Sequence, residues 1–447
     1  MTAKIPSMRI CVVGGGMSGI AAAYFIAKQG IEVELLEAET RLGGRVGCDR
    51  LGDKLIEFGG KNIGRDYRLF RQFVNDMGKF EYEFFGINTS TVANGKIHEI
   101  RSERPLRNLI NVARLTGVKD FVRIAALVSA VRRNSRNGFL GGEYFRRLSE
   151  KWDNEPLSSH FGERACKQFL RPLLVRMNGA EAHEYYAGAL GSNLKMILDT
   201  YDQLCDGFSP VIDAFAKRVK IVTGVKVHRL IVRDGAVTGV VQSSGAHFTE
   251  NGYDGVVLAT PAAITASIVR ESLPELAGEL DKVRYNPVAV AIARYRRDIF
   301  PPQRRAIVFD DRFELSNAGA YGINDRDIVR YTFSGGLATQ HIDKNTDADH
   351  VIALGEKHLA SHFSVHADDR TGFVYRYFRH GLCAYAPYHH RILDAVDATT
   401  QNVYGLGITG DYIRGASIEA CFRAAYEASE KLCNRLPSSH VSLRRVS

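Results

Sequence analysis

Three glycines and an acid near the start of the chain have types and spacing that suit the binding of nucleotide phosphates. Gly14, Gly16 and Gly19 follow the spacing G-x-G-x-x-G, and Glu37 comes 18 residues after Gly19. In such a turn one glycine permits the tight bend, one lets the backbone approach a pyrophosphate, and one lets a helix pack closely on a strand. An acid at this distance accepts hydrogen bonds from a ribose. The chemistry expected here is the binding of a dinucleotide.

The elements around these residues have the order that positions such a site. Residues 10–13 are an apolar run typical of a buried parallel strand. A segment with helical periodicity covers residues 20–29 and is stopped by Gly30, and a second apolar strand, 33–36, ends on Glu37. The helix N-terminus presents free N–H groups and a positive dipole end to phosphates. A lone glycine motif fits a tight turn in any α/β protein, but the complete strand–helix–strand set favours a dinucleotide site.

The residues after Glu37 indicate which dinucleotide is bound. They read AETRLGGRV, and residues 56–64 read IEFGGKNIG. This resembles the flavin-dependent amine oxidase superfamily, which includes monoamine oxidases, protoporphyrinogen oxidases and phytoene desaturases. The resemblance implies non-covalent FAD, with Glu37 on the adenosine ribose and Arg45 along the pyrophosphate and flavin. The residues implied to hold FAD in this part of the chain are Gly14, Gly15, Gly16, Met17, Ser18, Gly19, Glu37, Ala38, Arg41, Gly44, Arg45, Gly59, Gly60, Lys61 and Asn62.

Two later stretches resemble the same family. In the first, the backbone of Val227 is implied to meet the adenine, and a strand ends in Ala259, Thr260 and Pro261 beside the cofactor. In the second, a strand ends at Gly410 and Asp411, and a helix begins at about Ser417, a good N-cap. The family places that helix N-terminus, with the Ile418 N–H, at the flavin ring. A positive dipole end there stabilises the negative charge of the reduced ring.

The resemblance predicts an α/β fold that contains two domains. One is a Rossmann-type, glutathione-reductase-like FAD-binding domain, and the other is an inserted α+β substrate domain. The FAD-binding domain is expected in three segments, and the substrate domain in two, of which the first is largely helical and the second contains a mixed sheet. The expected FAD segments are 1–78, 205–265 and 385–436, the substrate segments are 79–204 and 266–384, and 437–447 is a tail.

Substrate oxidation is the reaction that these features favour. Only one dinucleotide fingerprint is visible, which argues against a monooxygenase fed by a second nucleotide. Hydride would leave a C–H bond of a small organic molecule for the flavin, forming C=C or C=N, with oxygen or another acceptor taking the electrons. Aligning the apolar strand 285–295 places Val290 where amine oxidases carry a lysine, which favours the protoporphyrinogen oxidase and desaturase branch. An amine or amino-acid oxidase and a redox-silent FAD isomerase or scaffold remain alternatives.

Candidate catalytic residues are few. Tyr385 and Tyr388 are the natural candidates to line the substrate cavity, since the family carries aromatic residues there. Lys61 either faces the flavin, where it could polarise N5 or hold an acidic substrate, or faces solvent, and the solvent-facing alternative is favoured. Of the pair at 389–390, at most one histidine would face the cavity if the chain is extended. Covalent flavin attachment through Cys383 is not favoured, because cysteine is frequent in this chain.

Composition limits the class of protein. The chain has 447 residues, 45% of them hydrophobic, and is long enough for more than one domain. It has no uninterrupted apolar run of membrane-spanning length and no apolar core of a signal peptide near its start. Seven scattered cysteines without a C-x-x-C pair favour a reducing compartment and argue against a metal site, so a cytoplasmic protein is expected.

Much of the net charge of +9 lies in one segment. Residues 101–136 hold nine basic residues against two acids, with apolar residues between them at helical spacing. Such a segment suits peripheral contact with an anionic membrane. A pair of ordinary helices with a solvated basic face is the simpler interpretation and is favoured. Nucleic acid is not expected, because no recognition motif is present. The oligomeric state is left open, with a homodimer among the expectations.

Overall fold

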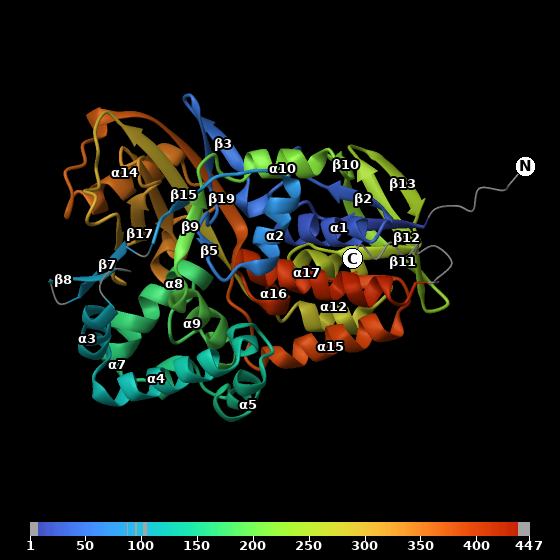
Figure 1. Cartoon of the computed structure of the whole chain (residues 1–447), viewed down its shortest axis with the longest axis horizontal. Helices are drawn as coiled ribbons and strands as arrows, with labels where there is room; N and C mark the ends of the chain where they lie inside the picture. Colours follow the sequence, from blue (N-terminus) through green and yellow to red (C-terminus); the bar gives the residue numbers. More distant parts are fainter. Residues whose placement is uncertain (1–7, 87, 94–95, 102–104, 437–447) are drawn as a thin grey trace, which may run out of the picture.

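A five-stranded parallel sheet carries the glycine turn at one edge. The computed structural model in Figure 1 describes residues 8–86, 88–93, 96–101 and 105–436. Neighbouring strands all pair in parallel, as in a Rossmann-type sheet. β1 and β14 are apolar almost throughout because both faces of the sheet are covered. The strand order is β10 (Lys220–Thr223), β2 (Glu32–Glu37), β1 (Arg9–Val13), β14 (Gly255–Leu258) and β20 (Leu406–Ile408).

Helices from the two ends of the chain pack together on this sheet. α1 (Met17–Lys28) lies beside α17 (Ile418–Cys433), as the blue and red helices of Figure 1 show. Gly30, with φ of +80°, follows the end of α1, which confirms the predicted stop. Further helices packed on these elements are α2 (Arg68–Met77), α10 (Ser209–Ala216), α11 (Ala262–Val269), α12 (Pro274–Leu280), α15 (His389–Asn402) and α16 (Asp411–Arg414).

An antiparallel sheet of three strands follows β10. It consists of β11 (Lys226–Arg233), β12 (Ala236–Ser244) and β13 (His247–Gly252). Asp234 and Gly235 both have positive φ and form the hairpin turn between β11 and β12. β13 was not predicted, because its residues are almost all exposed and polar and give no alternation of apolar side chains.

A second large sheet has one face packed on helices. β15 pairs antiparallel with both β18 and β19. Its alanines at 289, 291 and 293 point into an apolar core that also contains Val351 and Ile352 of α14 (Ala348–Leu359). β7 and β8 pair antiparallel as a hairpin, and the turn between them at 94–95 lies outside the described residues. The strand order is β19 (Arg370–Cys383), β15 (Tyr285–Tyr295), β18 (Ile328–Phe333), β17 (Leu315–Ala320), β16 (Ala306–Val308), β7 (Asn88–Ala93) and β8 (Lys96–Arg101).

A group of helices lies below this second sheet in Figure 1. A π-helical turn, Cys166–Leu170, precedes Pro172 and merges with the next helix, so the proline lies next to a distortion of the helix. The helices are α3 (Pro105–Thr116), α4 (Val118–Arg133), α5 (Glu143–Trp152), α6 (Leu157–His160), α7 (Glu163–Ala165), α8 (Arg171–Asn178) and α9 (Leu190–Leu198).

Short strands and one short helix complete the described part of the chain. β5 (Ile63–Gly64) and β6 (Tyr82–Phe84) both pair with β9 (Tyr201–Leu204), which joins residues that follow the first glycine motifs to the helical group. The remaining elements are β3 (Cys48–Leu51), β4 (Lys54–Glu57) and α13 (Gly336–His341). The predicted tail, 437–447, lies outside the described residues.

Candidate functional site

A cavity of about 2080 Å³ lies between the parallel sheet and the seven-stranded sheet. Pockets for a single small ligand usually measure about 300–1,000 Å³, so this cavity has room for more than one ligand. Its wall contains the glycine turn after β1, the ends of β2 and β14, and the start of α17. It also contains one face of the seven-stranded sheet and parts of α3, α4 and α8.

The glycine turn forms one end of the cavity. Gly14 has φ of +104°, which suits glycine, and a Cβ built on Gly16 meets nothing within 4 Å. The Gly15 amide donates to Glu37 Oε2 at 2.5 Å, and the Glu39 amide donates to Glu37 Oε1 at 2.8 Å. Glu37 is therefore fixed at the carboxyl end of β2, beside an open space that Gly16 faces.

Most of the residues predicted to hold FAD lie in the wall. They are Gly14, Gly16, Met17, Ser18, Glu37, Ala38, Gly44, Arg45, Gly59, Gly60, Lys61, Asn62, Val227, Ala259, Thr260, Pro261, Gly410, Asp411, Ser417 and Ile418. Gly15 and Gly19 do not. A Cβ on Gly19 would come within 1.8 Å of the Gly14 carbonyl oxygen, so Gly19 serves the packing of α1 on the turn.

Arg41 also differs from its prediction. Its guanidinium lies against Gly47 rather than in the cavity wall, and Nη2 is 3.6 Å from Glu39 Oε2. Both terminal nitrogens are buried, without a hydrogen-bond partner among the described residues. The Gly43–Gly44 turn that follows brings Arg45, not Arg41, to the cavity.

An ion pair joins the first and last motifs of the chain. Arg45 Nη1 lies 2.6 Å from Asp411 Oδ2 and donates to the Gly381 carbonyl at 3.0 Å. The Tyr285 hydroxyl donates to Asp411 Oδ1 at 2.6 Å. Burial alone would lower the pKa of Arg45, but the Asp411 carboxylate outweighs burial and raises it. Asp411 is 2% exposed, so this part of the wall is a fixed, charge-balanced unit.

The N-terminus of α17 reaches the same end of the cavity. Ser417 caps the helix, as predicted, because its Oγ accepts from the Ala420 amide at 3.1 Å. Glu419 in the first turn accepts instead from the amides of Leu69 and Phe70, at 3.2 and 3.1 Å. The acid of the first turn therefore ties α17 to α2 and leaves the positive end of the helix dipole to the cavity.

The seven-stranded sheet supplies the floor of the other end. The strand register places one residue from each of five neighbouring strands in a row across the sheet, and this row faces the cavity. The residues before and after them in each strand point to the other face of the sheet, which packs on the core. Arg330 belongs to the next row, with Gly319 and Ala306 beside it. The first row consists of Val290, Thr332, Asn317, Val308 and Thr91. Val290 thus lies in the cavity floor, and the row carries no carboxylate or amine.

Lys61 faces the cavity rather than open solvent, so the favoured solvent-facing prediction was wrong. Its Nζ lies 3.4 Å from the ring centroid of Tyr321, a cation–π contact. Burial lowers its pKa to about 8. Gly60 before it leaves open space, whereas a Cβ on Gly59 would lie 2.7 Å from the Arg45 carbonyl oxygen. Lys61 and the two glycines therefore form one side of the cavity beside Arg45.

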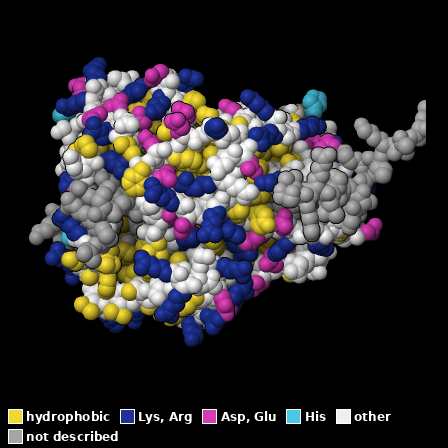
Figure 2. Space-filling view, viewed as in Figure 1, with side chains coloured by type: hydrophobic (Ala, Val, Ile, Leu, Met, Phe, Trp, Pro, Cys, Tyr) yellow, Lys and Arg dark blue, Asp and Glu magenta, His cyan; other side chains and the backbone are white. Residues whose placement is uncertain are grey.

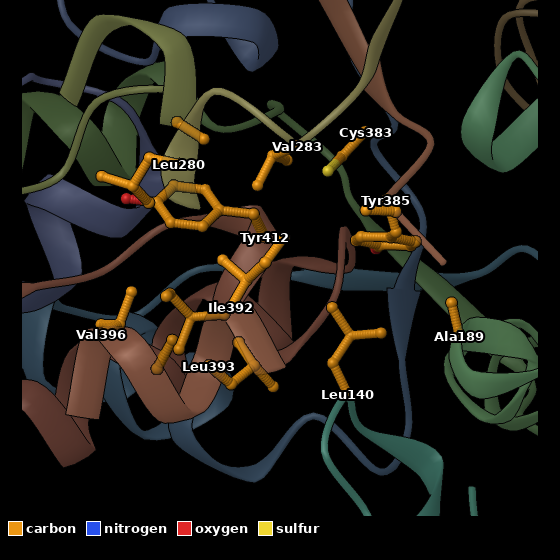
Figure 3. Packing of buried hydrophobic residues seen from close by; sticks show 14 of the residues in the cluster. Leu140, Ala189, Leu280, Val283, Cys383, Tyr385, Ile392, Leu393, Val396 and Tyr412 are labelled. Carbon is orange, nitrogen blue, oxygen red and sulfur yellow. The ribbon is translucent and has the colours of Figure 1, made fainter. Parts of the chain in front are cut away.

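The predicted tyrosines are not in the cavity wall. Figure 3 shows Tyr385 among buried apolar side chains with Cys383 and Leu140, and Tyr385 is 1% exposed. Tyr388 lies at the start of α15, where its amide donates to Asp153 and the Arg391 guanidinium lies over its ring. The cavity wall from this strand ends at residue 383, so the aromatic motif was assigned a few residues too late in the chain.

The two histidines that follow are also engaged elsewhere. Residues 389–390 begin helix α15 rather than an extended strand, so the predicted alternation does not apply. His389 bonds to the Tyr412 carbonyl at 2.7 Å, and burial lowers its pKa to about 4. His390 bonds to Glu150 at 2.6 Å. Neither lines the cavity.

Four residues of the wall or its support were not predicted: Arg176, Arg330, Tyr285 and Tyr321. The sequence does contain a signal for Arg330, because this arginine interrupts an otherwise apolar strand that reads IVRYTF. Tyr285 and Tyr321 act through contacts with residues more than a hundred positions away, for which a single sequence gives no signal. No group of side chains able to hold a metal ion occurs among the described residues.

The fold and this cavity define a dinucleotide-binding α/β protein with a substrate chamber. Residues 17–433 match the family described as flavin containing amine oxidoreductase, and the chain belongs to this family. It is therefore a flavin-dependent oxidoreductase, as the motifs predicted. In the described part of the chain, no helix is both long and apolar enough to cross a membrane.

Similar proteins include both branches of the family. Coproporphyrinogen III oxidase of Mycobacterium leprae (strain TN) is 21% identical, over 95% of this chain and 98% of that protein. L-amino-acid oxidase of Sistrurus catenatus edwardsii is 38% identical, but over only 20% of this chain and 17% of that protein. Cyclohexylamine oxidase from Brevibacterium oxydans IH-35A has the same fold, with a TM-score of 0.74 at 15% identity over 96% of this chain and all of that one.

Proposed function

We propose that this chain binds FAD without a covalent link and removes hydride from a C–H bond of a small organic substrate, forming C=C or C=N in a biosynthetic pathway. Oxygen or another acceptor would take the electrons. One observation carries the proposal: a single cavity joins the glycine turn of the parallel sheet to the floor of the seven-stranded sheet. Hydride transfer needs cofactor and substrate in one enclosed volume, placed by the protein.

The described residues fit FAD. Gly16 and Gly60 leave open space where side chains would obstruct a ligand. Glu37 has lone pairs left for a ribose, since each of its oxygens accepts one amide. The phosphates would lie at the start of α1, and the ring would lie near Arg45, Gly59 and the N-terminus of α17. The domain boundaries inferred from the motifs remain part of this proposal.

Non-covalent binding is supported by the state of Cys383. This thiol lines the cavity, but burial and the Asp411 carboxylate raise its pKa well above the ordinary value. A thiol held in its protonated form is a weak nucleophile. All seven cysteines are free, which supports a reducing compartment, and we place the protein in the cytoplasm.

A bound flavin supplies the hydride acceptor. The described residues near it supply position and charge. Val290, Thr332 and Asn317 offer a floor without an acid or base, so the proton that leaves with the hydride when C=C forms would go to water or to a group outside this row. The positive end of α17 stabilises negative charge at the ring. Apolar residues of α3, α4 and α8 exclude water from the substrate.

Two measurements on the purified holoprotein test this function. Acid precipitation should release FAD into the supernatant, whereas flavin in the pellet would contradict the non-covalent proposal. Anaerobic mixing with the substrate should bleach the visible absorbance of the flavin. A flavin that stays oxidised while the substrate is converted would identify a redox-silent isomerase instead. Peroxide release with simple amines would identify a C–N oxidase.

We also propose that α3 and α4 contact an anionic membrane surface. Their inner residues, such as Leu115 and Ile124, are buried, as the simpler interpretation of two ordinary helices expected. Their outer face is unusual, because Ile110, Val118 and Val122 are 52%, 81% and 61% exposed. Figure 2 shows hydrophobic side chains at the lower left, over the position of these helices, with dark blue side chains nearby. The exposed basic residues of this surface are Arg107, Arg114, Lys119, Arg132 and Arg133.

This surface has the composition of an interfacial helix pair, with apolar side chains for the lipid and basic ones for its phosphates. Flotation with vesicles of phosphatidylserine should carry the protein, and phosphatidylcholine vesicles should carry less. Val122→Glu should reduce flotation about fivefold or more, at about 1 kcal/mol or more for one buried apolar side chain. Phe248→Glu, at an equally exposed apolar residue on β13, is the control. Equal flotation of both variants would contradict the proposal.

A further inference from the structure

Lys61, Arg330 and Arg176 are three of the cationic side chains that line the cavity. Lys61 lies over the ring of Tyr321, Arg330 projects from the sheet floor, and Arg176 projects from α8. Arg330 and Arg176 are close enough to influence one another: burial, with a smaller contribution from the charge of Arg176, lowers the pKa of Arg330 to about 10. Burial also lowers the pKa of Arg176. Each cation therefore has a charged form that its surroundings disfavour.

The acids of the cavity wall are engaged with other groups. Glu37 accepts from backbone amides, and Asp411 is paired with Arg45. Asp199 accepts from the amides of Arg65 and Thr200 at 3.1 and 2.8 Å. These acids lie at the nucleotide end or on the strand and loop near β5, and none forms an ion pair with Lys61 or Arg330 among the described residues.

The acid that acts electrostatically on both Lys61 and Arg330, Glu57, lies behind the wall. Glu57 is 4% exposed and does not line the cavity. It accepts from the Tyr321 hydroxyl and from the Phe208 amide, the latter at 2.8 Å. Arg330 itself donates to the Gly59 carbonyl, which orients its guanidinium without neutralising it. The Gly59 carbonyl thus orients Arg330, and the Tyr321 ring positions Lys61. No described carboxylate forms an ion pair with either side chain, so an anion in the cavity could balance their charge.

We propose that the substrate carries an anionic group, a carboxylate or a phosphate, that binds Lys61, Arg176 and Arg330. This inference rests on the proposed function, because it assumes that the substrate occupies this end of the cavity. A guanidinium presents a planar fork of donors that matches carboxylate and phosphate oxygens, and the Lys61 ammonium adds a point charge. A protonated amine would be repelled at the same place.

The rest of the substrate is apolar. Beyond the three cations, the wall toward α3, α4 and α8 is formed largely by aliphatic and aromatic side chains. These are Leu109, Val112, Leu115, Phe121, Ile124, Val128, Phe169 and Leu173. An organic acid with a bulky hydrocarbon body matches both the charge at one point and the apolar surface around it. Its reacting C–H bond would belong to that body, since the acid group is held at the cations.

Unreactive probes of one chain length test this class directly. Decanoate, decyl phosphate, decanol and decylamine are titrated against the FAD holoprotein, and binding is followed through the visible spectrum of the flavin. We expect decanoate or decyl phosphate to bind about tenfold or more tightly than decanol, and decylamine to bind least. The order of the two anions distinguishes a carboxylate substrate from a phosphate substrate. Decylamine binding as tightly as the anions would overturn the proposal.

Single substitutions of the cationic residues show which side chains bind the anionic probe. Lys61→Met and Arg176→Met should each weaken anion binding about tenfold or more and leave decanol binding unchanged. Arg176→Lys should recover part of the loss. The matched control is Lys167→Met, which removes a charge that is exposed and paired with Glu163 at 2.8 Å. If the two cavity variants bind decanoate like wild type, the cations do not hold an anion.

The same samples separate this inference from the proposed function. FAD content and the melting temperature are measured for every variant, so a folding or cofactor defect is visible apart from probe affinity. Loss of FAD binding in the wild-type protein would contradict the proposed function. Normal FAD binding without a preference for anions contradicts only the substrate class.

Discussion

The two ends of the cavity are built in different ways. The nucleotide end consists of glycines, backbone amides and one buried ion pair, Arg45 with Asp411, in which charges are balanced within the protein. The substrate end consists of strand residues with Lys61 and Arg330 beside it, whose charges no described carboxylate pairs. The charges of the nucleotide end are balanced within the folded protein. In our proposal, the charges of Lys61 and Arg330 at the substrate end are balanced when an anionic ligand is present. A dinucleotide is a fixed component of such an enzyme, and the substrate comes and goes.

Among the variants that compare the two ends of the cavity, a substitution of Gly19 should change the free energy of unfolding most. A Cβ at Gly19 would meet the Gly14 carbonyl oxygen at 1.8 Å, a backbone atom that cannot turn away. We expect Gly19→Ala to lower the free energy of unfolding by about 3 kcal/mol, the upper end of overpacking. Chemical denaturation of the apoprotein measures this.

Gly16→Ala is the matched change in the same turn. Its Cβ meets nothing within 4 Å, and Gly16 has φ of −73°, which alanine adopts freely. The apoprotein should unfold like wild type, but FAD retention should fall, because the methyl group occupies space proposed for the phosphates. An apoprotein as unstable as Gly19→Ala would show that the turn is strained throughout.

The ion pair at the nucleotide end should give the next largest effect. Asp411→Ala removes the buried carboxylate that pairs with Arg45, whose side chain is 36% exposed, so the loss should be about 2 kcal/mol, less than for a fully buried pair. FAD affinity and stability should fall together. Tyr285→Phe removes only one hydrogen bond to Asp411 and should cost about 1 kcal/mol. Equal losses in both variants would mean that charge balance is not what holds this end together.

The substrate end should respond to pH where the nucleotide end does not. Because burial lowers the pKa of Lys61 to about 8, its amine is charged below pH 8 and neutral above it. Decanoate affinity should be constant at low pH and fall up to about tenfold per unit above pH 8. The charged groups that act on Lys61 are Glu57, Asp325, Lys54 and Glu83. Lys61→Met should remove the pH step, and a step that persists would assign it to another group.

Tyr385 should show the smallest effect. Its hydroxyl is buried without a hydrogen-bond partner among the described residues, and the ring lies in the apolar cluster of Figure 3. Tyr385→Phe removes an unsatisfied polar group, so the melting temperature should be unchanged or slightly higher. The rate of anaerobic flavin reduction by substrate should stay within about twofold of wild type. A large fall in that rate would show that Tyr385 takes part in catalysis, contrary to its position in the apolar cluster.

The same contrast explains what could be predicted from the sequence. The glycine turn, β1, α1 and β2 are local, so spacing and periodicity identified them together with Glu37. The helix cap at Ser417 was equally local. The substrate end depends on register among strands from distant segments, and period-two patterns do not say which strand lies beside which. Arg330 and Arg176 therefore went unrecognised, and the tyrosines of 385–388 were assigned to a wall that ends at residue 383.

The pairing of Arg45 with Asp411 also sets an order of assembly. Asp411 follows Arg45 by 366 residues, so it is synthesised long after Arg45, together with β20 and the N-terminus of α17. Until then Arg45 lacks this carboxylate partner, and the parallel sheet lacks β20 at its edge. A chain cut before β20 therefore lacks Asp411 and the N-terminus of α17, which are part of the same end of the cavity as Arg45.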